Sequence, residues 1–158
     1  MYASAFAVGL GADEVVFVST QKVQCDLAST YGANAHLVEG LTEIGDLGEF
    51  DVTVDTSGVA EALGFALRST GPSGVATCTA GATHRGRDVA LPVYEMYMNT
   101  VTFHTGWVHT RSFMAEPLAL IADGLFDPLV AATTVSFDDA ALAFAEPFTK
   151  LVLRRPIP

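Results

Sequence analysis

Two hydrophobic stretches of the chain each end in small hydroxyl residues and a glycine, the residue types that let a ligand approach the backbone closely. These endings are Thr56-Ser57-Gly58 and Thr79-Ala80-Gly81. In open parallel sheets, ligands bind beyond the carboxyl ends of the strands. The two endings are therefore the predicted mouth of a binding site.

Few side chains near these endings offer acid–base chemistry. Asp55 precedes the first ending and could act on a substrate, although a carboxylate in this position more often accepts hydrogen bonds from the turn that follows. His104 alternates with apolar residues, a pattern that favours a pocket-wall histidine over a proton shuttle. The trio His84, Arg85 and Arg87 could face a phosphate, but a solvated polar loop is the simpler interpretation.

A strand–helix–strand unit is predicted to position the two endings. Residues 51–56 alternate as in a half-buried strand, residues 59–68 carry apolar side chains at helical spacing, and residues 75–81 form a second strand. Gly71-Pro72-Ser73-Gly74 separates the helix from that strand. A unit of about 30 residues with this order predicts parallel strands joined by a right-handed crossover.

Similar patterns continue on both sides of this unit and predict an α/β protein. In the predicted helix 22–31, Val23, Leu27 and Ala28 face inward. Near the end of the chain, Asp138 or Asp139 is expected to cap a short helix. The remaining predicted elements are a helix at 1–10, a strand at 14–19, a strand at 35–39, a short helix or turn at 92–98, a strand at 101–106, a helix at 112–123, a strand at 132–137 and a strand at 150–153.

The composition limits the classes of protein to which this chain could belong. Half of the residues are hydrophobic and the mean hydropathy is +0.37, which supports a sizeable core. No apolar run reaches the about 18 residues of a membrane helix, so we expect no membrane association. The formal net charge of −10 argues against a nucleic-acid partner. Cys25 and Cys78 lie outside any Cys-x-x-Cys pair, which favours two free thiols in a cytoplasmic protein over a disulfide or a zinc site.

Several stretches, in this order and spacing, resemble one protein family. The chain is similar to the cofactor-binding half and C-terminal tail of the medium-chain zinc-type alcohol dehydrogenases. The stretches that carry the resemblance are Gly11-Ala12-Asp13-Glu14-Val15-Val16-Phe17-Val18, Tyr31-Gly32-Ala33, Asp51-Val52-Thr53-Val54-Asp55-Thr56-Ser57-Gly58, Gly74-Val75-Ala76-Thr77, Val101-Thr102-Phe103-His104-Thr105-Gly106, Gly124-Leu125-Phe126-Asp127-Pro128 and Lys150-Leu151-Val152.

The resemblance implies a fold, a domain division and a cofactor. The fold would be a Rossmann-like, doubly wound, mostly parallel sheet over residues 1–131, followed by a strand–helix–strand tail over residues 132–158 that belongs with the catalytic domain of the family. The cofactor would be NAD or NADP. The residues implied to bind it are Thr56, Ser57 and Gly58 at the adenosine side, Thr79, Ala80, Gly81, Phe103, His104 and Thr105 along the nicotinamide side, and Lys150 at the pyrophosphate.

The sequence departs from the family in three places. The Gly-x-Gly-x-x-Gly fingerprint is missing, and Gly9-Leu10-Gly11 ends a helix instead of opening one. The zinc ligands of the family are missing too: His104 and His109 have no third ligand at suitable spacing, so zinc is expected only in the catalytic domain that the family places before this region. Where the family has an acid for the ribose, this chain has Ser19, which leaves room for a 2′-phosphate contacted by Ser19 and Lys22 or for an ordinary polar turn.

The missing fingerprint strand has a structural consequence. The family's strand order is 3-2-1-4-5-6, so strands 14–19 and 51–56 would lose their shared neighbour. Three outcomes are open: the two strands pair directly, a partner supplies a strand, or the isolated chain is poorly stable. We expect the chain to be a fragment or a truncated reading frame. The resemblance also implies a possible homodimer through the edge of strand 101–106.

The leading functional hypothesis follows from this resemblance. The parent protein would be an oxidoreductase that transfers hydride between a small alcohol or aldehyde and the nicotinamide, with zinc polarising the substrate oxygen. This chain would supply the cofactor wall and no catalytic residue, and would be inactive alone. The alternative is a non-catalytic Rossmann-like binding or interaction module. A nucleotide-dependent methyltransferase fits less well, because it also needs a glycine-rich loop after its first strand.

Overall fold

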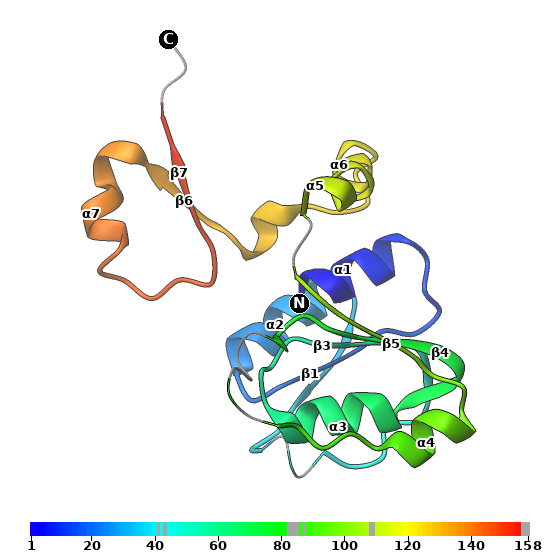
Figure 1. Ribbon diagram of the computed structural model, residues 1–158. Helices are drawn as coiled ribbons and strands as arrows, with labels where there is room; N and C mark the ends of the chain where they lie inside the picture. The colour runs from blue at the N-terminus through cyan, green and yellow to red at the C-terminus, as the bar shows by residue number, and fades with distance from the viewer. Residues whose placement is uncertain (41, 43, 82–85, 87, 108–109, 156–158) are drawn as a thin grey trace. The chain divides into compact units, whose positions relative to one another are not determined.

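The chain forms two compact units (Figure 1). The computed structural model describes residues 1–40, 42, 44–81, 86, 88–107 and 110–155. One unit comprises Met1–His36 and Phe113–Pro158, and the other comprises Leu37–Ser112. The sequence predicts a domain boundary after residue 131 instead, and that division stays a prediction. The α/β class is confirmed.

The unit of Leu37–Ser112 is built on a parallel three-stranded sheet with the order β3-β4-β5. The register aligns Asp55 with Cys78, and Cys78 with Thr105, at the carboxyl ends of the strands. The elements of this unit are β3 (Phe50–Asp55), α3 (Ala60–Arg68), β4 (Thr70–Cys78), α4 (Val93–Met98) and β5 (Thr102–Thr105).

Strand β4 begins earlier than the sequence predicts. Helix α3 ends before Gly71, as predicted. The predicted separation of helix and strand by Gly71-Pro72-Ser73-Gly74 is wrong, because these residues already form the first part of β4. They do so irregularly: the register with β3 shifts between Phe50 and Val52, and Ser73 has a φ of 61°. Gly74 is required in this crowded start, because a Cβ there would lie 2.7 Å from the Thr70 methyl carbon. The glycines and proline thus shape a bulge within the strand.

One face of this sheet carries the core of the unit. Leu63 and Leu67 of α3 pack on Ala76 and Cys78 of β4, with Phe103 of β5 partly buried against them. Helices α3 and α4 lie on that side of the sheet (Figure 1). Successive side chains of a strand point to opposite faces. Val52 and Val54 therefore point away from α3, and both are exposed.

The other unit is organised around aromatic packing. Phe126 is buried with Ala5 and Leu120, and its ring contacts the rings of Phe6, at 4.6 Å between centroids, and of Tyr2, at 5.4 Å. The elements of this unit are α1 (Tyr2–Gly9), β1 (Val16–Ser19), α2 (Lys22–Thr30), β2 (Asn34–Leu37), α6 (Ala115–Ala122), η2 (Pro128–Ala131), β6 (Thr133–Ser136), η3 (Phe137–Asp139), α7 (Ala140–Ala143) and β7 (Leu151–Arg154).

Two helix predictions in this unit need correction. Ala28 is buried as predicted and Leu27 is half-buried, but Val23 is exposed and Cys25 faces the interior in its place. The predicted helix 112–123 is divided into α5 (Thr110–Phe113) and α6. Helical periodicity is similar for neighbouring turns, so the pattern alone does not decide which turn contacts a core.

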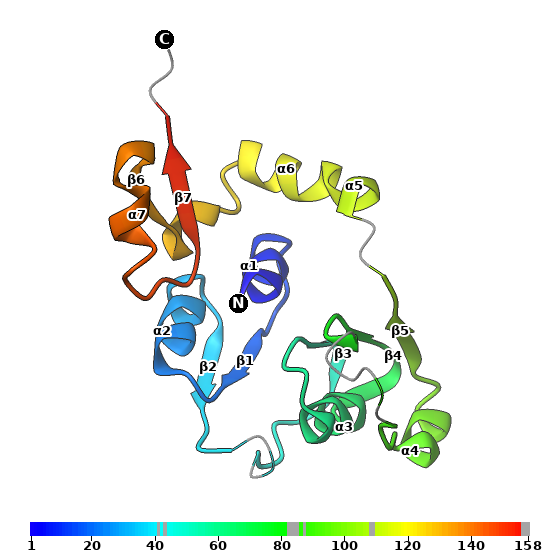
Figure 2. The same cartoon turned by 60° about the vertical axis from the view of Figure 1, so that its left-hand side comes forward.

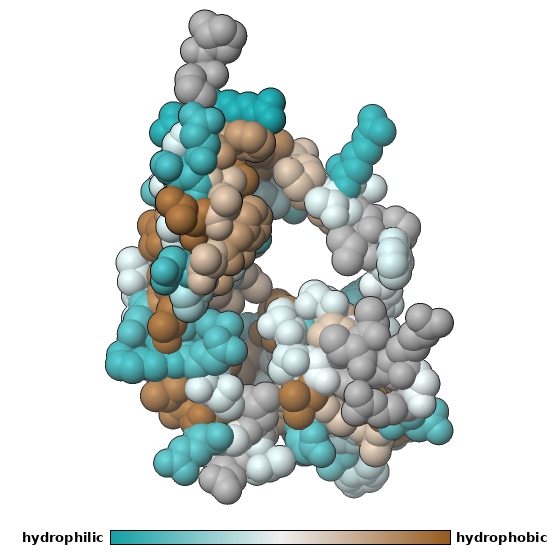
Figure 3. Space-filling model, turned by 90° about the vertical axis from the view of Figure 1, so that its left-hand side faces the viewer, coloured by the Kyte–Doolittle hydropathy of each residue, from teal (hydrophilic) through white to brown (hydrophobic). Residues whose placement is uncertain are grey.

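The C-terminal segment is a strand–helix–strand of its own. Strands β6 and β7 pair in parallel and α7 connects them (Figure 2). Asp139 occupies the N-cap position of α7, one of the two predicted residues, but its side chain makes no capping hydrogen bond. Ser136 caps the preceding η3, where its hydroxyl accepts a hydrogen bond from the Asp138 amide at 3.3 Å. Hydrophobic residues lie at the surface of this segment (Figure 3), among them Leu142 and Phe144.

Strands β1 and β3 do not pair in the described part of the chain. Strand β1 pairs with β2, and β3 is an edge of its own three-stranded sheet. Direct pairing, the first of the three predicted outcomes, is therefore not observed among the described residues. The outer edge of β3 keeps backbone groups available for another strand.

Leu67 is the residue whose truncation should destabilise the Leu37–Ser112 unit most clearly, because its side chain is 1% exposed. Leu67→Ala should lower the free energy of unfolding by about 3 kcal/mol, from lost apolar burial and the cavity left behind. Urea denaturation followed by circular dichroism measures this. The matched control is Val93→Ala, since Val93 is 66% exposed and should change stability little. An equal loss of unfolding free energy in the two variants would contradict the burial of Leu67 in the core.

Candidate functional site

The carboxyl ends of β3, β4 and β5 meet at one edge of the sheet. Asp55, Cys78 and Thr105 are in register there, and each is the last residue of its strand. A Cβ on Gly81 would lie 3.2 Å from the Thr105 hydroxyl oxygen, so the segment after β4 passes close to the end of β5. The sequence prediction that the two glycine endings gather at one edge is confirmed. Their contact with a ligand stays a prediction.

Asp55 organises the turn after β3. Its carboxylate is 5% exposed, and Oδ1 accepts hydrogen bonds from the Ser57 amide at 3.1 Å and the Ser57 hydroxyl at 2.6 Å. The Ser57 hydroxyl in turn accepts from the Val59 amide at 3.0 Å. Gly58 completes the turn with a φ of 71°, a conformation that favours glycine. Of the two sequence interpretations, the turn-capping one is confirmed for Asp55.

Thr79 continues this network to the next strand. Its amide donates to the Asp55 carbonyl at 3.0 Å, while its side chain is exposed. Thr56 and Thr105 are also exposed. The Thr79 hydroxyl donates to the same Asp55 carbonyl at 3.4 Å, and the Thr105 hydroxyl is hydrogen-bonded to the Cys78 thiol. The three exposed threonines define a threonine-rich edge at the strand ends, where their oxygens can accept hydrogen bonds from a ligand.

Phe103 and His104 lie on opposite faces of β5. Phe103 is partly buried against the core cluster of Leu63 and Leu67, so its ring belongs mainly to the core. His104 is exposed. Because side chains alternate along a strand, only one of the two can face a ligand that lies on one side of the sheet.

Cys78 is buried beneath this edge. Its thiol lies 3.5 Å from Asp55 Oδ2, to which it donates. Burial, together with the nearby Asp55 charge, raises the pKa of the Cys78 thiol. Burial likewise raises the pKa of the Cys25 thiol in the other unit. Neither thiol has the lowered pKa of a nucleophilic cysteine.

The remaining candidate residues belong to the other unit. The Ser19 hydroxyl donates to Gln24 Oε1 and accepts from the Gln21 amide, both at 3.1 Å, so it holds the turn that precedes α2. Lys22 is exposed and its ammonium forms an ion pair with Asp26 at 2.7 Å. Lys150 is exposed, with its ammonium 5.5 Å from the Tyr2 ring centroid. Both lysine ammonium groups are accessible to an anion.

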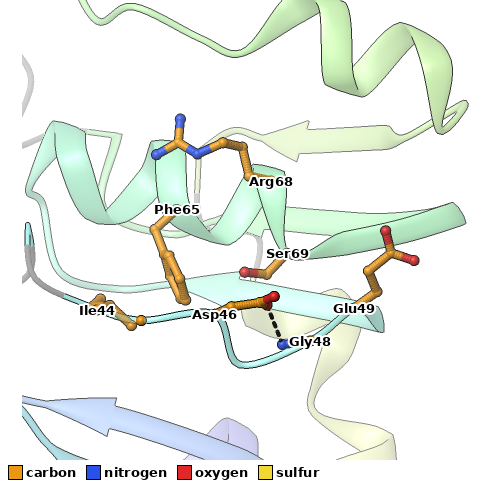
Figure 4. Close-up of a pocket in the computed structure, with 8 residues that line it drawn as sticks. Ile44, Asp46, Gly48, Glu49, Phe65, Arg68 and Ser69 are labelled. Atoms are coloured by element: carbon orange, nitrogen blue, oxygen red, sulfur yellow. Dashed lines mark hydrogen bonds between the residues drawn. The ribbon is translucent and has the colours of Figure 1, made fainter.

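A shallow pocket lies elsewhere on the Leu37–Ser112 unit, near the amino end of β3 (Figure 4). Its volume is about 510 Å³, and Asp46, Phe65 and Arg68 are among its lining residues. The Phe65 ring points toward the loop of Asp46, whereas the Arg68 guanidinium points away from it. This pocket is at the opposite end of β3 from the threonine-rich edge, and the sequence gives no signal for it.

The described residues provide neither a cluster of metal ligands nor a membrane-spanning helix. No group of three or more His, Cys, Asp or Glu that could hold a metal ion lies within the described ranges. No helix in that part of the chain is long and apolar enough to span a membrane. His84, Arg85, Arg87 and His109 lie outside the described residues.

The fold is similar to that of known dehydrogenases. A zinc-binding-domain alcohol dehydrogenase from Burkholderia ambifaria matches with a TM-score of 0.76 at 20% identity, over 98% of this chain and 45% of that one. 2R,3R-butanediol dehydrogenase from Bacillus subtilis matches with a TM-score of 0.74 at 18% identity, over 98% and 47%. The YhdH oxidoreductase from Salmonella enterica, in complex with NADP, matches with a TM-score of 0.69 at 19% identity, over 96% and 49%.

The fold is that of the alcohol dehydrogenases. The resemblance seen in the sequence is thereby confirmed at the level of fold, including its Rossmann-like character. The chain spans about half the length of the dehydrogenases that it matches. No protein-family model and no curated protein matches the sequence.

Proposed function

We propose that this chain is the nicotinamide-dinucleotide-binding part of a medium-chain, alcohol dehydrogenase-like oxidoreductase. The observation that carries the proposal is the match of 98% of the chain to alcohol dehydrogenases, with the threonine-rich edge at the carboxyl ends of a parallel sheet. Ligands of open α/β sheets bind at that end. The reaction of the parent protein would be hydride transfer between a small alcohol or aldehyde and the nicotinamide.

The residues at this edge fit a dinucleotide. The turn of Thr56, Ser57 and Gly58 would border the adenosine side, and the segment Thr79–Gly81 with Thr105 would follow the nicotinamide side. The exposed threonine hydroxyls and the close approach of Gly81 to Thr105 support this assignment. In the other unit, the accessible ammonium of Lys150 would meet the pyrophosphate, since Lys serves as a point charge for phosphate.

The chemistry itself would lie outside this chain. The bound dinucleotide supplies the hydride, and in the family a zinc ion polarises the substrate oxygen. In this proposal the chain binds and orients the cofactor and contributes no catalytic residue. A cytoplasmic location and a small-molecule alcohol or aldehyde substrate belong to the same proposal.

A second candidate function is a non-catalytic binding module. The exposed apolar side chains of α4, namely Val93, Tyr94, Tyr97 and Met98, favour it, because such surfaces are typical of interfaces. This alternative predicts stable folding without dinucleotide binding. Cofactor binding therefore separates the two functions.

The 158-residue chain should bind NADH or NADPH at micromolar strength and show no alcohol turnover. Calorimetry measures the binding, and circular dichroism checks folding in the same buffer. A folded chain that binds neither dinucleotide would overturn the proposal and favour the interaction module. Robust hydride transfer with alcohols by this chain alone would contradict the assignment of the chemistry to another part of the parent protein.

The preference between the two cofactors is proposed to depend on Lys22. If its ammonium meets the 2′-phosphate, Lys22→Ala should weaken NADPH binding about tenfold and leave NADH binding unchanged. Asp26→Asn is the matched control, because it frees Lys22 from its ion pair and should strengthen NADPH binding. Equal effects of Lys22→Ala on both cofactors would identify the Ser19–Lys22 segment as an ordinary turn.

The proposal also includes a homodimer that forms through the outer edge of β5. Strand β5 is the other edge of its sheet, so its backbone can pair with a second copy. Sedimentation velocity should give twice the 16.6 kDa mass of one chain. Thr102→Lys should shift the chain to the monomer, because a charged edge side chain opposes strand pairing, whereas Thr133→Lys on β6 should not. A monomer at all concentrations would rule this interface out.

A further inference from the structure

Asp55 is a buried carboxylate held entirely by groups of its own unit. Oδ1 accepts from the amide and the hydroxyl of Ser57, and Oδ2 faces the Cys78 thiol at 3.5 Å. Among the described residues, no lysine or arginine forms an ion pair with it. Both carboxylate oxygens of Asp55 thus accept hydrogen bonds.

The same hydrogen bonds occupy the only donor of the Ser57 hydroxyl. A serine hydroxyl has one proton to donate, and Ser57 gives it to Asp55 at 2.6 Å. One of its acceptor positions is used by the Val59 amide at 3.0 Å. The hydroxyl therefore builds the turn and has no proton left for a ligand. The neighbouring Thr56 is exposed, and its hydroxyl makes no hydrogen bond to another described residue.

The end of β4 is tied to the same residue. The Thr79 amide donates to the Asp55 carbonyl at 3.0 Å, and Cys78 donates to the Asp55 carboxylate. Asp55 thus joins the turn after β3 to the segment after β4. The Asp55 side chain itself contacts Ser57 in the first segment and Cys78, the residue before the second.

We infer that Asp55 is a positioning residue for the dinucleotide, and that Thr56, not Ser57, presents the turn's hydroxyl to the ligand. This inference rests on the proposed function for its ligand. It assigns Asp55 no contact with the cofactor and no acid–base role. Of the three residues after β3, Thr56 would contact the ligand, whereas Ser57 and Gly58 would shape the turn.

The test compares four variants by NADPH affinity and by amide hydrogen exchange at residue 57, measured by NMR on the free protein. Asp55→Ala should speed that exchange and raise Kd about tenfold. Asp55→Asn should keep both the exchange rate and Kd near the wild-type values, because the amide oxygen can still accept from Ser57. Thr56→Val should raise Kd about tenfold without changing the exchange. Ser57→Ala keeps the backbone bond to Asp55 and should raise Kd less than Thr56→Val does.

The matched control is Asp51→Asn, an exposed carboxylate on the same strand, which should change neither readout. The inference is overturned if Asp55→Ala binds like the wild type, or if Ser57→Ala weakens binding as much as Thr56→Val. If Asp55→Ala does not fold, the comparison of Thr56→Val with Ser57→Ala still decides it. A wild type that binds no dinucleotide would reject the proposed function, while exchange at residue 57 would still report whether Asp55 holds the turn.

Discussion

A buried hydroxyl pair at the junction of α3 and β4 holds the sheet unit together. Thr70 is fully buried, and its hydroxyl donates to the Ala66 carbonyl of α3 at 2.8 Å while contacting the Thr53 hydroxyl of β3 at 2.7 Å. The Thr70 carbonyl accepts from the Asn99 side chain, which follows α4. Since a buried polar group without partners would be costly, this one residue fixes a helix, a strand and a loop together. It helps to hold β3 in its register on β4, which pairs Phe50 with Thr70 and Thr53 with Ala76.

That register determines the candidate site. Parallel strands in register end at the same edge of the sheet. The residues after β3, β4 and β5 therefore lie together there, although they are far apart in the sequence. The side chains at this edge then divide by burial. Asp55 and Cys78 point into the core side and shape the edge, whereas the threonines stay exposed. A ligand would meet a surface already ordered by the strands beneath it, which lowers the entropy cost of binding.

The sheet also leaves apolar surface uncovered. Parallel sheets are normally buried on both faces. Here Val52 is 64% exposed on the edge strand β3, and the outer side of α4 carries exposed tyrosines. Both surfaces are of the kind that proteins cover with further structure. They agree with a chain that spans about half the length of the dehydrogenases it matches.

The sequence by itself determined the order and type of most elements, because periods of 3.6 and 2 residues are local properties. It also located the two glycine endings and the turn-capping carboxylate, since a strand-end Asp followed by Ser and Gly is a local turn signal. Only the tertiary structure decided that Gly71–Gly74 belongs to β4, that Val23 is exposed and that the Ser57 hydroxyl is engaged. Each of these depends on which distant atoms come into contact, and a local pattern carries no information on that.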